Sequence, residues 1–261
     1  MILGQAIALA LAIAVSTTLF GRRALKLYGL VRSGKSASRF DDVPARTRAE
    51  ATVVIGQSKL LQRLLPGLMH AAIFWGFLVL LPTIVIAMIG AVDSHATLPW
   101  LGAQGWYALL VDVFALLVLI GIITAVVIRK VQRPARFVGS HLGEADLILG
   151  LIAGIVVSLF LWHASQIALG LNDYTASWAP IASAIASVLP RPALPYLERA
   201  AVWAHVLIIL SFLVYLPYSK HLLILVAAIN VYFGRTRARG RLEPINFEVP
   251  EQEVEPPGDA D

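Results

Sequence analysis

Five stretches of this chain are long and apolar enough to cross a lipid bilayer, and this limits the folds open to it. A membrane-spanning helix needs roughly 20 mostly apolar residues. The fifth stretch is too long for one crossing, so we expect it to kink at Pro217 and continue as an interfacial helix. The sequence therefore predicts an all-α membrane protein, a five-transmembrane-helix bundle. The stretches are residues 2–20, 64–90, 106–128, 145–170 and 200–233.

The distribution of Lys and Arg predicts how this bundle lies in the membrane. Of the 21 basic residues, ten lie in 21–63, four in 129–136 and five from Lys220 onward, so nineteen share one side. Cytoplasmic loops carry an excess of such residues, which places the N-terminus outside and the C-terminus in the cytoplasm. The same bias explains the net charge of +5, so we expect no nucleic-acid partner.

The chain divides into four segments on this reading. The basic cytoplasmic segment is expected to hold an amphipathic helix on the membrane surface. The acidic, Pro-rich end of the chain has the composition of a disordered or partner-binding tail. The segments are transmembrane helix 1 (1–20), the basic cytoplasmic segment (21–63), a four-helix haem-binding transmembrane core (64–233) with an outer loop at 171–199, and a cytoplasmic tail (234–261).

Histidines inside the apolar stretches are the strongest functional signal. The chain has no cysteine, which excludes Cys-ligated iron–sulfur clusters and thioether-attached haem within it. His70, His163 and His205 nevertheless lie within spans, and His221 lies where the last span meets the cytoplasm. An ionisable ring in hydrocarbon is costly and marks a functional site by default, and imidazole is the commonest metal ligand.

Position along each helix converts to depth, at 1.5 Å per residue. His70 and His221 then lie near the cytoplasmic face, and His163 and His205 near the outer face. Each pair could hold one haem by bis-imidazole ligation, which suits electron transfer. Two alternatives remain open: a histidine can simply hydrogen-bond a neighbouring helix, and His221 faces away from His205 on an ideal helix.

Polar residues near the proposed outer haem are candidates for a quinone site. Such a site needs an apolar slot, hydrogen-bond donors for the carbonyls and a route for protons. The candidates are His163, Gln166, Asp173 and Trp178. Asp112, inside the third span, is expected either to carry a proton or to form a hydrogen bond between helices.

Two stretches carry a resemblance to a known family: "LMHAAIFWGFLVLLPT" (68–83) and "VWAHVLIILSFLVYLPYSKHLLIL" (202–225). They resemble the cytochrome b membrane domain of the nitrate reductase gamma subunit and its relatives. The resemblance is nearest to the membrane domain of iron–sulfur oxidoreductases of the electron-transfer-flavoprotein:menaquinone and heterodisulfide reductase type. It implies five helices in a bacterial or archaeal cytoplasmic membrane, and haem b held by histidines of the second and fifth helices.

By position, the resemblance assigns His70 and His205 as haem ligands. The nitrate reductase pattern has further histidines ten residues after the first and eighteen after the second, where this chain has Leu80 and Leu223. His163 and His221 could replace them. The sequence therefore leaves open two haems, one or none.

The function expected from these observations is electron transfer between the quinone pool, menaquinone or ubiquinone, and a cytoplasmic partner. The resemblance implies an iron–sulfur subunit with cysteine-rich cluster domains, and an electron-transfer flavoprotein as a further partner. The chain would not be catalytic alone. The alternatives are a haem-free membrane anchor that tethers such a partner, favoured by Leu80 and Leu223, and a small transporter, which would show internal symmetry that the sequence lacks.

Overall fold

The regular elements of the chain are all helices in the computed structural model, which describes residues 2–34, 39–135, 142–219 and 222–234. Five of these helices are long and apolar enough to cross a membrane, which confirms the expected multi-pass, all-helical architecture. They are α1 (Ile2–Arg32), α3 (Leu64–Val92), α4 (Gly105–Val127), α5 (Leu142–Leu169) and α7 (Leu194–Tyr215).

The core of the bundle lies between α3, α4, α5 and α7, where small and branched side chains interlock. Ala87, Val111, Leu159 and Val202 are almost fully buried there. Helix α3 approaches α4 so closely that a Cβ at Gly76 would lie 2.1 Å from a methyl carbon of Val118. Apolar helices gain little from the hydrophobic effect inside a bilayer, so close packing of this kind holds them together.

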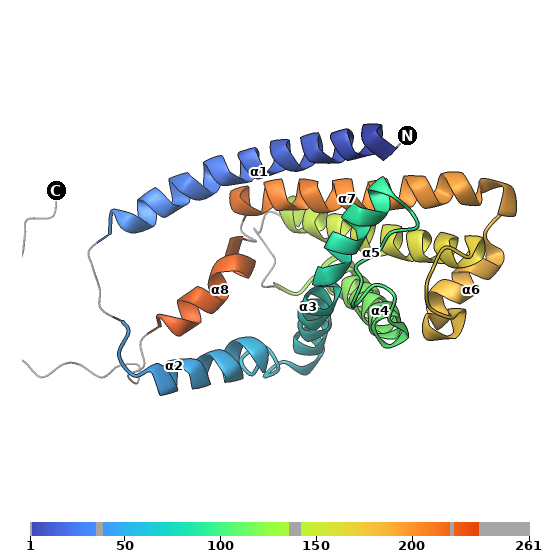
Figure 1. The fold of residues 1–261 in the computed structure, drawn as a ribbon. Helices are drawn as coiled ribbons and strands as arrows, with labels where there is room; N and C mark the ends of the chain where they lie inside the picture. The colour runs from blue at the N-terminus through green and yellow to red at the C-terminus, as the bar shows by residue number, and fades with distance from the viewer. Residues whose placement is uncertain (1, 35–38, 136–141, 220–221, 235–261) are drawn as a thin grey trace, which may run out of the picture.

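Helix α1 lies at the edge of the bundle and runs beside α7 in the same direction (Figure 1). It buries only Leu9 and Ser16. It continues to Arg32, well past the end of the first expected span at residue 20. Most of the surface of α1 is therefore left for lipid.

Short helices gather at the two ends of the bundle. At one end, the expected outer loop 171–199 contains α6 (Pro180–Val188) between the turns Ala176–Trp178 and Arg191–Ala193, and α7 already begins at Leu194. We call this the α6 end. At the other end, the basic segment forms α2 (Val43–Ala49) and the π-helix Glu50–Ile55, and α4 runs into the π-helix Ile128–Gln132.

Helix α7 does not continue into the last helix. It ends at Tyr215, a 3₁₀ turn at Leu216–Tyr218 follows, and α8 (Leu223–Tyr232) then departs at an angle (Figure 1). The expected stretch 200–233 is thus a spanning helix and a separate short helix. Pro217 has no N–H to extend the helix ladder, which accounts for the break.

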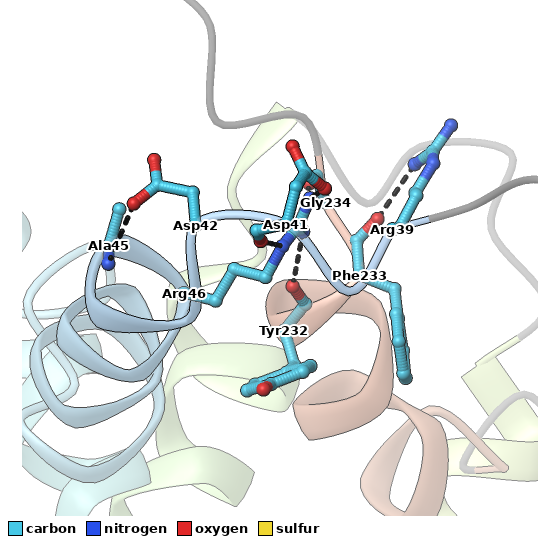
Figure 2. A network of polar contacts seen from close by, with 8 residues as sticks. All are labelled: Arg39, Asp41, Asp42, Ala45, Arg46, Tyr232, Phe233 and Gly234. Carbon is cyan, nitrogen blue, oxygen red and sulfur yellow. Dashed lines mark hydrogen bonds and ion pairs between the residues drawn. The ribbon is translucent and has the colours of Figure 1, made fainter.

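Buried arginine holds α8 against the basic segment (Figure 2). Arg46, only 3% exposed, donates to the carbonyl oxygens of Tyr232 (2.8 Å) and Gly234 (2.9 Å) and pairs with Asp41 (2.9 Å). Arg39 donates to the carbonyl of Phe233 (2.7 Å). These cations satisfy the last carbonyls of α8, where the helix dipole is negative. We call this the α8 end of the bundle.

Candidate functional site

His205 is the most deeply buried of the predicted haem ligands that the structure describes. It lies on α7 and is 1% exposed. Its Nδ1 lies 2.9 Å from the carbonyl oxygen of Ile155 and 3.1 Å from the hydroxyl of Ser158, both on α5. A carbonyl can only accept, so Nδ1 carries the proton and Nε2 keeps a lone pair. Among the described residues, Nε2 is buried without a hydrogen-bond partner.

This arrangement is typical of a histidine that binds a metal. Metal-ligating histidines usually donate their other ring N–H to a carbonyl or carboxylate, which fixes the tautomer and the ring orientation. The donor set of His205 therefore fits an axial ligand of haem iron. Ile155 and Ser158 would be the positioning groups behind it.

His70 shows the same tautomer at the α8 end. Its Nδ1 lies 2.9 Å from the side-chain oxygen of Gln57, whose amide in turn donates to the carbonyl of Val54 (2.5 Å). Nδ1 is again the donor, and Nε2 is left as the acceptor. His70 differs from His205 in being exposed on the bundle surface. Gln57 has no counterpart among the residues singled out in the sequence.

His163 and His205 contact the same tryptophan. The ring centroid of Trp162 lies 5.0 Å from that of His163 and 6.3 Å from that of His205. The structure thus brings together the two histidines that depth arguments placed at one level. His163 faces a pocket at the α6 end, whereas His205 faces α5.

A charged pair with a buried carboxylate, which sequence reasoning missed, lies beside these rings. Glu198, 2% exposed, accepts from the indole N–H of Trp162 (3.3 Å) and pairs with Arg199 (3.0 Å). Arg199 also donates to the last carbonyls of α3, at Gly90 (3.3 Å) and Ala91 (3.1 Å), and to the Ser94 hydroxyl. The available signal was the spacing, because Glu198 precedes His205 by seven residues and so shares its helix face.

The pocket at the α6 end, which we call the end pocket, is lined by three of the predicted quinone-site residues: His163, Gln166 and Asp173. Its volume is about 40 Å³. Drug-sized ligands occupy pockets of several hundred Å³, whereas one water needs on the order of 10–15 Å³ measured with a water-sized probe. The pocket is thus the size of a few water molecules.

Asp112 does not line the end pocket but lies directly behind it. Its two carboxylate oxygens accept from the backbone N–H groups of Ile181 (2.7 Å) and Ala182 (3.0 Å). Pro180 has no N–H, so these are the first two amide hydrogens of α6. Of the two expected roles, the structure shows the hydrogen bond between helices, with Asp112 of α4 capping α6.

The other loop residues at this end separate into two groups. Tyr174 lines the end pocket, and burial followed by the negative charge of Asp112 raises its pKa to about 12. Trp178, in contrast, lies over Gly105 at the start of α4, where a Cβ would lie 2.5 Å from its ring, and is 43% exposed. The structure therefore separates Trp178 from the other quinone-site candidates.

The remaining ligand positions fall outside these clusters. His221 and the tail 235–261 lie outside the described residues. Leu80 packs against the buried core, and Leu223 is 59% exposed in the first turn of α8. Because α7 ends at Tyr215, position 223 does not share a helix with His205.

Comparisons with known proteins give two relatives. A protein of Bacillus subtilis (strain 168), described as "Probable iron-sulfur-binding oxidoreductase FadF", is 29% identical over 198 residues, which are 74% of this chain and 28% of that protein. The "EtfAB:quinone oxidoreductase" of Syntrophomonas wolfei subsp. wolfei (strain DSM 2245B / Goettingen) is 27% identical over 234 residues, 85% of this chain and 32% of that protein.

This chain therefore spans about a third or less of the length of either relative. No family model matches it, and no solved structure matches it. Both relatives are described as oxidoreductases, which agrees with the resemblance drawn from the histidine-bearing stretches. Kinship with the nitrate reductase cytochrome b stays a prediction.

Proposed function

We propose that this chain is the membrane-spanning electron-transfer part of a quinone-linked oxidoreductase. It would exchange electrons between an isoprenoid quinone in the bilayer and a partner that carries iron–sulfur clusters or flavin. Five candidate spans and similarity to an iron–sulfur-binding and a quinone oxidoreductase support this. We also propose that the basic end of the bundle, with α2 and α8, is cytoplasmic.

The observation that carries the proposal is the state of His205. A buried imidazole with Nδ1 held by a carbonyl and Nε2 unpaired leaves a costly acceptor in an apolar core unless something binds it. Haem b is the group we propose, with His205 and His70 as ligands. When bound, it supplies a one-electron carrier within the bilayer. His163 and His221 are the further ligands proposed if each haem has two histidines.

The end pocket has a different role in this proposal. Reduction of a quinone to a quinol takes up two electrons and two protons, so the chain must move protons as well. His163, Gln166 and Asp173 line a space that suits water rather than a quinone ring. We assign them to a hydrated proton path at the α6 end, with Tyr174 as a neutral hydrogen-bonding group because of its raised pKa.

A haem-free anchor is the second candidate, and the packing of Leu80 favours it. The position where the nitrate reductase pattern has a ligand is filled by a side chain of the core. Such an anchor would keep the fold and tether the same partner without carrying electrons itself.

Haem content separates the two candidates. The purified chain, produced with ample haem, should show a b-type reduced-minus-oxidised spectrum, and a pyridine haemochrome assay should give the number of haems per chain. His205→Ala should remove one haem and leave membrane insertion intact, and His70→Ala should do the same at the α8 end.

His141→Ala is the matched control, since His141 lies in the sequence between the expected spans 106–128 and 145–170. It should keep the haem content of the unaltered chain. Absence of haem from the unaltered chain, or equal haem in all three variants, would leave the anchor as the function.

A further inference from the structure

A groove of about 670 Å³ opens along the side of the bundle between α1 and α7. We call it the lateral groove. Its walls are mostly apolar and include Ala12 and Val15 from α1 and Leu207 and Val214 from α7. The two helices run beside each other in the same direction (Figure 1). Its volume lies in the range of small-molecule sites, unlike that of the end pocket.

The loose contact of α1 explains why the groove persists. This helix buries only two side chains, Leu9 and Ser16. In a bilayer, no hydrophobic driving force closes a gap between two apolar helices, because lipid tails are as apolar as the helices. The groove therefore suits a long apolar molecule that enters from the membrane.

Three hydroxyl groups that line the groove form no hydrogen bond within the described structure. Tyr218 is 57% exposed and its ring faces Arg23, which leaves Ser16 and Tyr215 as the two hydroxyls best placed for a ligand. Ser16, 8% exposed, lines the groove, and no hydrogen bond of its hydroxyl is found among the described residues. The same holds for the phenol of Tyr215. Tyr215 is half-buried, and neither hydroxyl is used by the described part of the protein, so both are available to donate to an acceptor on a ligand.

The two hydroxyls lie toward one end of the groove, which gives it polarity. Arg23 of α1 donates to the carbonyl of Pro217 (3.3 Å), so these two residues lie within the reach of one arginine side chain of each other. Counting back at 1.5 Å per residue puts Ser16 near the level of Leu210, about 7 Å along the axis from Tyr215. Side chains lean toward the helix N-terminus, so the phenol of Tyr215 is directed toward the level of Ser16.

We propose that the lateral groove binds an isoprenoid quinone, an inference that rests on the proposed function. The ring lies between Ser16 and Tyr215, whose hydroxyls donate to its two carbonyl oxygens. The prenyl tail follows the apolar walls toward Ala12 and out into the bilayer. This assignment replaces the end pocket as the quinone site, since a ring and tail match the groove in size and polarity and do not match the pocket.

The first test is photolabelling of the full chain in lipid nanodiscs. The probe is an azido-benzoquinone with an alkyl tail, competed with menaquinone, and the labelled peptides are mapped by mass spectrometry. Label should appear on the peptides of α1 and α7 that hold Ser16 and Tyr215. Label confined to the loop 171–178 or to other helices would overturn the proposal.

The second test fills the groove. Ala12→Trp should weaken binding of the probe by about tenfold or more. Ala14→Trp is the matched control, because Ala14 is exposed on the same helix and does not line the groove. Equal affinity of the two variants would overturn the assignment.

The third test removes the hydroxyls without changing the shape of the groove. Ser16→Ala and Tyr215→Phe should each weaken binding by about 2- to 12-fold, the value of one hydrogen bond. This keeps the proposal falsifiable if Ala12→Trp fails to insert. Unchanged affinity in both variants would contradict the placement of the ring.

The outcomes also separate this inference from the function it rests on. If the chain binds the probe outside the groove, the groove assignment fails and the quinone-linked function stands. If it binds no quinone, both fail, while the haem spectrum still reports on electron transfer. If Ala12→Trp instead expels a co-purified phospholipid and leaves quinone affinity unchanged, the groove is a lipid site and the inference is wrong.

Discussion

Asp112 shows how one charged side chain inside an apolar helix can be structural. Its carboxylate accepts two backbone N–H groups at the start of α6, where the helix dipole is positive. It is 2% exposed, so no solvent competes for those bonds. The carboxylate thereby holds helix α6 against this end of the bundle.

We expect Asp112→Asn to loosen this end. An amide oxygen can accept, but the amide NH₂ would face a second backbone N–H, so one helix donor loses its partner. The loss should be about 1–3 kcal/mol of unfolding free energy, measured as a lower thermal midpoint in detergent and as faster proteolysis within 171–193. Asp173→Asn, at an exposed position in the adjoining loop, is the control. Equal destabilisation by both variants would contradict the capping role.

The tautomers of His205 and His70 are set by the residues that surround them. A histidine in an apolar stretch predicts a functional site, but the tautomer depends on the acceptor that faces Nδ1. That acceptor is the carbonyl of Ile155 in one case and the side chain of Gln57 in the other. Both leave Nε2 as the atom able to bind a metal.

Helices α2 and α8 depend on each other through buried arginine. Arg46 on α2 reaches the final carbonyls of α8 (Figure 2). Phe40 packs edge-on against Phe233, with ring centroids 5.5 Å apart. The basic segment and the last helix therefore form one polar cap at the α8 end. Any partner that binds this end meets both segments together.

Arg46→Ala should release α8. The variant removes charge-assisted bonds worth about 1.5–3 kcal/mol each and leaves helix carbonyls unsatisfied, so hydrogen exchange of the amides in 226–234 should rise sharply. Arg48→Ala, an exposed arginine on the same helix, should leave exchange unchanged. Arg46→Lys should leave hydrogen exchange nearly as fast as Arg46→Ala does, because a lysine cannot reproduce the forked geometry of the guanidinium. Equal exchange in Arg46→Ala and Arg48→Ala would show that the cap does not hold α8.

The whole molecule is a bundle with two chemically different ends. The α6 end carries the end pocket, the Glu198–Arg199 pair and few basic residues. The α8 end carries α2, α8 and most of the described basic side chains. If the basic end is cytoplasmic, the redox partner binds at the α8 end, and the ring proposed in the lateral groove lies toward that same end, because Tyr215 ends α7 there.

Cysteine labelling tests this orientation, and the absence of native cysteine makes it direct. Thr47→Cys on α2 and Ser187→Cys on α6 place single thiols at exposed positions of opposite ends. A membrane-impermeant maleimide added to intact cells should label Ser187→Cys at once and Thr47→Cys only after lysis. The reverse pattern would invert the topology, and with it the side proposed for the partner.

The sequence by itself determined the five spans and the histidines within them, because hydrocarbon demands long apolar helices and makes each buried polar side chain conspicuous. It could not determine partners across helices. The cap that Asp112 forms on α6 and the contacts of Glu198 with Trp162 and of Arg199 with the end of α3 all join residues far apart in the chain. Only tertiary structure decides these, since hydrogen bonds of this kind depend on helix register and rotation, which hydropathy does not encode.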